Sequence, residues 1–73
     1  MRYEGKAKVV VDGIDFFFKG QEVTSYKLTN GEYDNMSSRR YSESEYKKLG
    51  LRDRIIVCGK ESARVYSHEI EMI

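Results

Sequence analysis

The feature that most constrains the fold of this chain is a pair of turn-forming dipeptides, Asp12-Gly13 and Asn30-Gly31. Each is typical of a two-residue β-hairpin loop of the type I′ kind, in which both central residues take a positive φ. Such loops join neighbouring antiparallel strands, and apolar residues alternate with other residues on both sides of the first dipeptide. The sequence therefore predicts two β-hairpins in the first half of the chain.

The register of the first hairpin follows from its turn and its hydrophobic alternation together. A two-residue loop creates one apolar face, formed by the cross-strand pairs Val11 and Ile14, Val9 and Phe16, and Ala7 and Phe18. Phe17 falls on the opposite, mostly polar face, beside Lys8 and Lys6. Because a shift of one residue would reverse every side chain, the turn and the alternation predict this register and an exposed Phe17.

The second hairpin has a weaker apolar face. Its Asn-Gly dipeptide sets Leu28 opposite Tyr33 and Tyr26 opposite Asn35. Gly20, which lies between the two hairpins, is predicted to be a bend or bulge where the chain turns a corner.

A short helix is predicted after the second hairpin. Ser42 and Glu45 form the S-x-x-E pattern of a capping box, and Gly50 stands where a left-handed C-terminal cap belongs. A helix of about two turns is too short to be stable alone. We therefore expect its apolar edge, Tyr46 and Leu49, to pack onto the sheet.

The last third of the chain returns to β structure. A continuous β-branched run, Ile55–Cys58, is followed by a four-residue turn and an antiparallel return over Ala63–Tyr66. Cys58 then lies opposite Ala63 and is expected to be a small buried hydrophobic residue. The alternation over residues 69–72 predicts a final edge strand.

These elements predict a mainly β fold of the β-rich α+β kind, a small antiparallel barrel or curled sheet of about five or six strands. The predicted order is hairpin, hairpin, short helix, hairpin. Residues 1–73 are expected to form one small domain, because a chain of this length has room for a single hydrophobic core.

The segment Leu49–Val57, followed by Ala63–Val65 and Ser67–Ile73, resembles the closing half of a Src-homology-3-like barrel. In that family a strand pair is followed by a short turn and a last strand. The resemblance implies a fold and no function. The strand-helix-strand order also resembles the oligonucleotide-binding barrel, whose helix joins its third and fourth strands.

Charge and composition exclude several classes of protein. The 13 Lys and Arg residues against 12 Asp and Glu leave a formal charge of +1, far from the basic excess of a dedicated duplex-DNA binder. No apolar run approaches the ~20 residues that span a bilayer. A single cysteine favours a reducing compartment. We therefore expect a cytoplasmic protein without a membrane partner.

The residues that catalysis and metal binding most often use are scarce. Cys58 is the only thiol and His68 the only imidazole, and the predicted hairpin separates them by roughly 16 Å at ~3.3 Å per residue. One of each is too few for structural zinc, and the acidic residues lack the spacing of a calcium loop. The Gly59-Lys60 pair lacks the flanking residues of a phosphate loop. We expect no enzyme activity, no cofactor and no metal, with His68 a surface residue in a turn.

Local charge gives the strongest binding signal. Between Ser37 and Arg54, six basic residues stand against three acidic ones, and tyrosines are interleaved with them. Arg and Lys beside stacking aromatic rings grip single-stranded nucleic acids without sequence readout. The other interpretation of this segment is a solvated helix face with ordinary charge pairs.

Two non-catalytic functions follow. The first is a protein-interaction module, such as an inhibitor or accessory protein of a phage or other mobile element, which binds a protein partner through exposed aromatic anchors. Its sheet edges also allow a homodimer. The alternative is single-stranded nucleic-acid binding through residues 37–54. The candidate binding residues for either partner are Phe17, Arg39, Arg40, Tyr41, Tyr46, Lys47, Arg52 and Arg54.

Overall fold

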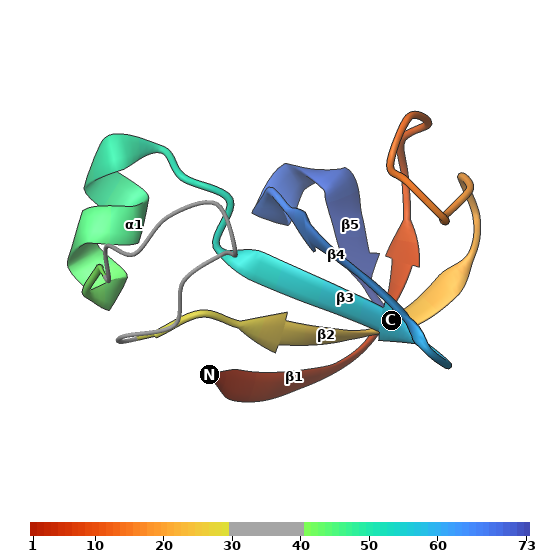
Figure 1. Ribbon diagram of the computed structural model, residues 1–73, viewed down its shortest axis with the longest axis horizontal. Helices are drawn as coiled ribbons and strands as arrows, with labels where there is room; N and C mark the ends of the chain where they lie inside the picture. The colour runs from red at the N-terminus through yellow and green to blue at the C-terminus, as the bar shows by residue number, and fades with distance from the viewer. Residues whose placement is uncertain (30–40) are drawn as a thin grey trace.

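A computed structural model describes residues 1–29 and 41–73 and shows one twisted antiparallel sheet with a short helix at one end (Figure 1). The described elements are β1 (Arg2–Val9), β2 (Glu22–Lys27), α1 (Glu43–Leu49), β3 (Arg54–Cys58), β4 (Glu61–Val65), the 3-10 turn η1 (Ser67–Glu69) and β5 (Ile70–Met72). The strands are ordered β4-β3-β2-β1-β5, so the last strand lies beside the first. The predicted mainly β fold with a short helix is confirmed.

β5 confirms the edge strand predicted at the end of the chain. It pairs antiparallel with β1, with Ala7 opposite Met72 and Val9 opposite Ile70. Ile70 is buried, whereas Met72 is about half exposed. The sheet is open, because β4 and β5 are its two outer strands.

The core lies on one face of the sheet, hereafter the inner face. Small and β-branched side chains dominate it, because they pack well on a pleated surface. Burying one Val or Ile side chain fully contributes roughly 1.5–3 kcal/mol. The buried cluster consists of Ala7, Val9, Phe17, Val23, Ile56, Val65 and Ile70.

The prediction for the first hairpin is wrong in both loop and register. β1 pairs with β2, with Ala7 opposite Val23, and residues 10–21 form the connection in place of a two-residue loop at Asp12-Gly13. A strand over residues 14–18 would take the edge of β1 that β2 occupies. Since β2 also pairs with β3, the larger sheet outweighs the local turn signal.

The three consecutive phenylalanines are placed the opposite way to the prediction. Phe17 is 7% exposed and belongs to the core, whereas Phe16 is 73% exposed and Phe18 is 65% exposed. Phe16 takes a φ of 69°, which breaks the strand alternation. The N–H of Phe17 then donates to the carbonyl of Ile14 at 3.1 Å. The predicted exposure of Phe17 is therefore wrong, and its two neighbours are the exposed rings.

The predicted bend at Gly20 is confirmed, because this residue has a φ of 93° in a turn directly before β2. Most of the second predicted hairpin, including the loop at Asn30-Gly31, lies outside the described residues. Within the described sheet, Tyr26 lies between Tyr3 on β1 and Ile55 on β3. Both edges of β2 are therefore paired at this position.

The predicted helix is confirmed with both of its caps. Ser42 Oγ accepts a hydrogen bond from the N–H of Glu45 at 3.2 Å, and Glu45 Oε1 accepts one from the N–H of Ser42 at 3.0 Å. Gly50 ends the helix with a φ of 64°. Tyr46 is buried as predicted, but Leu49 is 54% exposed. Because α1 lies at the end of the sheet (Figure 1), only part of its predicted apolar edge is covered.

The β3–β4 hairpin is tighter than predicted. Its loop is Gly59-Lys60, with Gly59 at a φ of 62°, and Cys58 lies opposite Glu61 instead of Ala63. The register moves by an even number of residues, so the same side chains stay on the inner face. Cys58 lies at the end of the hairpin beyond the core and is exposed. Its predicted burial is therefore wrong.

Candidate functional site

The inner face of the sheet changes from apolar to polar toward the helix. Along β2 the inner positions run from Val23 through Ser25 to Lys27, and along β3 they run from Ile56 to Arg54. Lys27 lies opposite Arg54. Ser25 is fully buried. Polar residues in positions that would otherwise hold aliphatic side chains are a local inconsistency of the kind found at functional sites.

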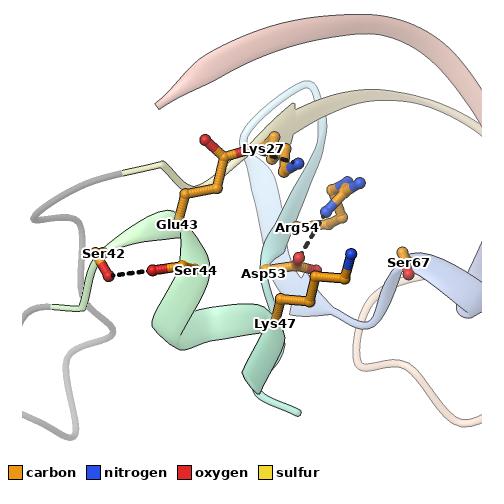
Figure 2. A pocket seen from close by; sticks show the side chains of 8 residues that line it. All are labelled: Lys27, Ser42, Glu43, Ser44, Lys47, Asp53, Arg54 and Ser67. Carbon is orange, nitrogen blue, oxygen red and sulfur yellow. Dashed lines mark hydrogen bonds and ion pairs between the residues drawn. The ribbon is translucent and has the colours of Figure 1, made fainter. Parts of the chain in front are cut away.

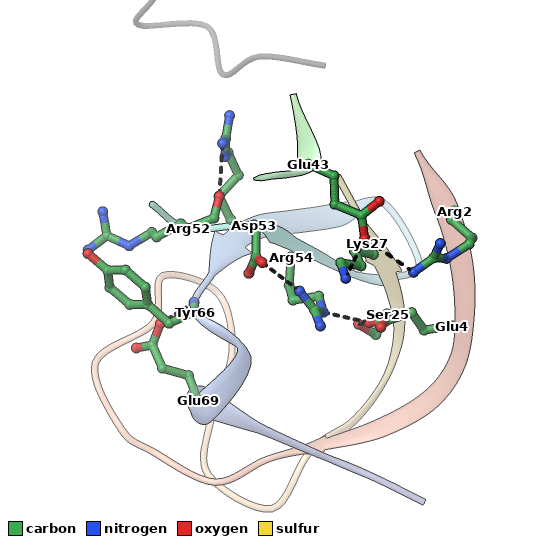
Figure 3. A network of polar contacts seen from close by, with 11 residues as sticks. Arg2, Glu4, Ser25, Lys27, Glu43, Arg52, Asp53, Arg54, Tyr66 and Glu69 are labelled. Atoms are coloured by element: carbon green, nitrogen blue, oxygen red, sulfur yellow. Dashed lines mark hydrogen bonds and ion pairs between the residues drawn. The ribbon is translucent and has the colours of Figure 1, made fainter. Parts of the chain in front are cut away.

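A β-bulge brings Glu4 into this polar region. The pairing of β1 with β2 shifts between Tyr3 and Gly5, and Gly5 has a φ of 116°. Glu4 is therefore the additional residue of the bulge, and its side chain is redirected. Its Oε1 accepts hydrogen bonds from Ser25 Oγ at 3.0 Å and from Arg54 Nε at 2.8 Å (Figure 3).

Arg54 is shared between two carboxylates. Its Nε pairs with Glu4, and its Nη1 lies 2.9 Å from Oδ2 of Asp53. The second contact is an ion pair without hydrogen-bond geometry, because the buried Nη1 has no hydrogen-bond partner among the described residues. The Arg54 side chain is only 15% exposed. An arginine at this depth needs such compensation, since burying an unpaired charge is costly.

A second ion pair links β2 to the helix. Lys27 Nζ lies 2.7 Å from Glu43 Oε1, and Arg2 Nη2 lies 3.8 Å from the same oxygen. The hydrogen bond from Lys27 and its positive charge lower the pKa of Glu43 below its ordinary value, with smaller contributions from Arg2 and Arg54. This pair attaches the first turn of α1 to the sheet.

An open groove of about 710 Å³ lies beside these ion pairs. Side chains from β2, α1, η1 and the segment that enters β3 surround it, and Figure 2 shows Lys47 extending from the helix beside Asp53. The groove is suited to a charged or hydrogen-bonding ligand, since its lining carries ammonium, guanidinium, carboxylate and hydroxyl groups. The lining residues are Lys27, Ser42, Glu43, Ser44, Lys47, Asp53, Arg54 and Ser67.

Three planar side chains stack next to the groove. The rings of Tyr66 and His68 are stacked, with centroids 5.2 Å apart and an interplanar angle of 12°. The guanidinium carbon of Arg52 lies 4.8 Å from the centroid of the Tyr66 ring. Arg64 Nη2 donates to the carbonyl of Arg52 at 2.9 Å, and the N–H of Tyr66 donates to Glu69 Oε1 at 2.7 Å (Figure 3). Backbone and side-chain hydrogen bonds thus hold this stack.

No sequence pattern singles out Tyr66 as a binding residue. His68 is exposed and lies in η1, as predicted for a surface residue in a turn. The stack forms because pairing of β3 with β4 returns Tyr66 to the segment that holds Arg52. Only the register of the β3–β4 hairpin could have placed Tyr66 beside Arg52. The loop length that the sequence predicts gives a different register.

The predicted aromatic binding residues are mostly covered. Phe17 lies in the core. Tyr46 is 1% exposed and meets the Tyr41 ring edge-on, with centroids 5.7 Å apart. Tyr41 is half-buried. Tyr46 therefore anchors the helix, and no exposed ring of α1 is available to stack with a ligand.

Several predicted basic residues converge on one region. Lys47 and Arg54 line the groove, and Arg52 joins the stack with Tyr66. Arg39 and Arg40 lie outside the described residues. Arg54 is already engaged by two carboxylates, so Lys47 and Arg52 are the more accessible cations of this group. The role of all these residues in binding stays a prediction.

Residues 1–29 and 41–73 hold no group of three or more His, Cys, Asp or Glu side chains that could share a metal ion. Within the same ranges no helix has the length and apolar character that crossing a membrane requires. Comparison of the chain with protein-family models, curated proteins and solved structures finds no match.

Proposed function

We propose that this chain is a non-catalytic protein-binding module whose contact surface is the β1–β2 loop, residues 10–21. The observation that carries the proposal is the exposure of the two rings on either side of Phe17 in the chain, Phe16 at 73% and Phe18 at 65%. Large exposed aromatic side chains are typical anchors of protein interfaces. The predicted anchor Phe17 is thus replaced by the residues on either side of it.

A contact with the core and two hydrogen bonds hold the β1–β2 loop in place. The buried Phe17 ring attaches its tip to the core. The N–H of Phe18 donates to Gln21 Oε1 at 3.1 Å, and the N–H of Gln21 donates to the carbonyl of Phe18 at 3.1 Å. A held loop presents its rings with less loss of conformational entropy on binding.

The backbone of Phe16 carries a conformational cost. It is the one residue other than glycine, among those described, with a positive φ, at 69°. A bulky side chain in the left-handed region costs roughly 1–3 kcal/mol, and such residues cluster at functional sites. This strain supports the proposal that the Phe16 ring contacts a partner.

The charges on the loop indicate the chemistry of the partner. Asp12 and Asp15 are exposed in the same loop as Phe16, and Lys19 is the only exposed cation in residues 10–21. A partner surface with an apolar pocket and a basic rim complements this arrangement. The two carboxylates disfavour an anionic membrane surface.

We extend the proposal to the type of fold, and the order of β3, β4, η1 and β5 supports it. A strand pair, a short turn and a last strand follow one another, as the Src-homology-3-like resemblance implies. The oligonucleotide-binding barrel is the other type that the strand-helix-strand order resembles. We therefore favour the first of the two barrel types.

Quantitative affinity capture tests the proposed function. The tagged wild-type protein, the double variant Phe16→Ala/Phe18→Ala and the variant Leu49→Ala are each incubated with lysate treated with nuclease. Leu49 is a matched control because it is an exposed apolar residue at the opposite end of the molecule (Figure 1). We expect a protein that the wild type and the control capture and the double variant loses.

The captured protein is then purified and titrated directly. Asp15→Lys is expected to weaken the complex several-fold at low salt, because a positive charge would face the basic rim of the partner. Equal capture by all three proteins, or tighter binding of the Asp15→Lys variant, would remove the loop from the proposal.

A further inference from the structure

A second surface is formed by η1, the segment that enters β3 and the groove beside α1. The stack of Arg52, Tyr66 and His68 stands beside the groove, and Ser67 borders both, since it lines the groove and lies between the two rings in the chain. Arg52 and His68 are exposed. The planar groups and the polar groove therefore form one continuous surface.

The electrostatics of this surface favour an anionic ligand. The carboxylates of Glu43 and Asp53 are engaged by Lys27 and Arg54. Lys47, in contrast, lines the groove without an ion pair to any residue of the described ranges. With the acids neutralised by their partners, Lys47 and the neighbouring Arg52 provide the accessible positive charge.

The aromatic groups restrict the kind of anion. An exposed imidazole already stacked on a tyrosine ring presents a flat π surface, and every nucleic-acid base has a complementary flat face. The guanidinium of Arg52 over Tyr66 adds a cation to the same stack. A simple phosphate or an acidic peptide would use the cations and leave this flat surface unused.

We propose that the surface formed by Arg52, Tyr66, His68 and the Lys47 side of the groove binds single-stranded nucleic acid. One base stacks on the exposed face of His68, and an adjacent phosphate contacts Lys47 and the hydroxyl of Ser67. Recognition by stacking is independent of sequence, because every base has a flat face. The site shares no residue with the loop that carries Phe16 and Phe18, so either proposal can fail without the other.

Fluorescence anisotropy with a labelled twelve-nucleotide oligothymidylate tests this site at ~50 mM and ~200 mM salt. We expect His68→Ala to weaken binding about tenfold, as stacking losses typically do. His68→Phe, which keeps a flat ring, should restore most of the affinity. This rescue separates stacking from a structural role, and circular dichroism of each variant confirms that it is folded.

Charge variants test the phosphate contact. Lys47→Ala should reduce the slope of log affinity against log salt by about 0.7, the contribution of one phosphate on a single strand. Lys60→Ala is the matched control, an exposed lysine in the β3–β4 loop at the far end of β3. It should leave both affinity and slope unchanged.

Three results would overturn the proposal. The first is no saturable binding of the oligonucleotide at ~50 mM salt. The second is an affinity that neither His68→Ala nor Lys47→Ala changes. The third is an equal affinity for a labelled poly-glutamate peptide that His68→Ala leaves intact, since that result would assign the surface to acidic peptides.

Discussion

Arg54 on β3 and Glu4 on β1 are fifty residues apart in the chain, yet Nε of the arginine lies 2.8 Å from Oε1 of the glutamate. The two strands do not pair with each other, because β2 lies between them in the sheet. Ser25 on β2 donates to the same oxygen at 3.0 Å. One carboxylate oxygen therefore connects three strands at the point where the apolar core ends.

Replacing the Glu4 carboxylate should destabilise the fold more than removing the Ser25 hydroxyl, which donates a hydrogen bond to it. Glu4→Gln keeps the shape but removes one of the two negative charges that pair with the mostly buried Arg54, so we expect a loss of about 1–3 kcal/mol in the free energy of unfolding. Ser25→Ala removes one hydrogen bond and should cost about 1 kcal/mol. Urea denaturation at neutral pH measures both values.

Lys60→Gln serves as the surface control for this pair and should stay within about 0.5 kcal/mol of the wild type. The difference between Glu4→Gln and the wild type should persist in ~0.5 M salt, because a mostly buried ion pair is screened less than an exposed one. A Glu4→Gln variant as stable as the control would mean that the pair contributes no net stability.

The ion pair between Lys27 and Glu43 predicts a pH dependence of stability. Because the pKa of Glu43 is lowered in the folded protein, chiefly by the hydrogen bond from Lys27, the folded state binds this proton less readily than the unfolded state. The contribution is fully present above the ordinary pKa of 4.5 and is lost as the pH falls through the lowered value. Urea midpoints from pH 7 down to pH 3 should therefore converge for the wild type and Glu43→Gln.

The informative quantity in that experiment is the difference in urea midpoint between the wild type and Glu43→Gln, since other carboxylates titrate in the same range in both proteins. Lys27→Met should remove the same pH-dependent difference from the opposite partner. A gap between wild type and Glu43→Gln that widens as the pH falls would contradict the assignment.

The sequence correctly predicts an element when a short local pattern is enough to determine where that element begins and ends. α1 begins and ends where Ser42, Glu45 and Gly50 place it, because a capping box and a left-handed cap involve only residues within one or two helical turns. The first hairpin was not predictable in this way. Its loop at Asp12-Gly13 competes with β2 for one edge of β1, and that competition depends on residues far along the chain.

The residues of the candidate site also fall into two groups, those that a local pattern predicts and those that it does not. Charge counting along the chain selects Lys47, Arg52 and Arg54, and the structure brings all three to one end of the sheet. Glu4 and Tyr66 escape prediction because a bulge and a hairpin register bring them there. Those features are set by pairing between strands, and no local pattern in this chain reports them.

The exposure of Cys58 predicts rapid reaction with thiol reagents in the folded state. The side chain lies at the end of β3, opposite Glu61 and beyond the core. We expect its labelling rate in native buffer to be within about tenfold of the rate in urea, whereas a core cysteine waits for opening events with equilibrium constants of roughly 10⁻³ or less. Cys58→Ser should change stability by less than about 0.5 kcal/mol. Labelling that is thousands of times slower than in urea would contradict the β3–β4 register.

The backbone conformation of Phe16 predicts an unusual order of stabilities for two substitutions. At an ordinary exposed position, glycine is less stable than alanine by roughly 0.5–1 kcal/mol. At a φ of 69°, alanine keeps the left-handed cost of about 1–2 kcal/mol and glycine does not. Phe16→Gly should therefore be at least as stable as Phe16→Ala in urea denaturation.

Phe18 provides the matched control for this order. It is a neighbouring phenylalanine of similar exposure, 65%, without a positive φ. Phe18→Gly should accordingly be less stable than Phe18→Ala, the reverse of the order at Phe16. If glycine is the less stable replacement at both positions, Phe16 carries no left-handed strain. If the orders differ while both Phe16 variants lose partner binding equally, the protein maintains a strained ring at a measurable cost to stability because that ring is needed for contact.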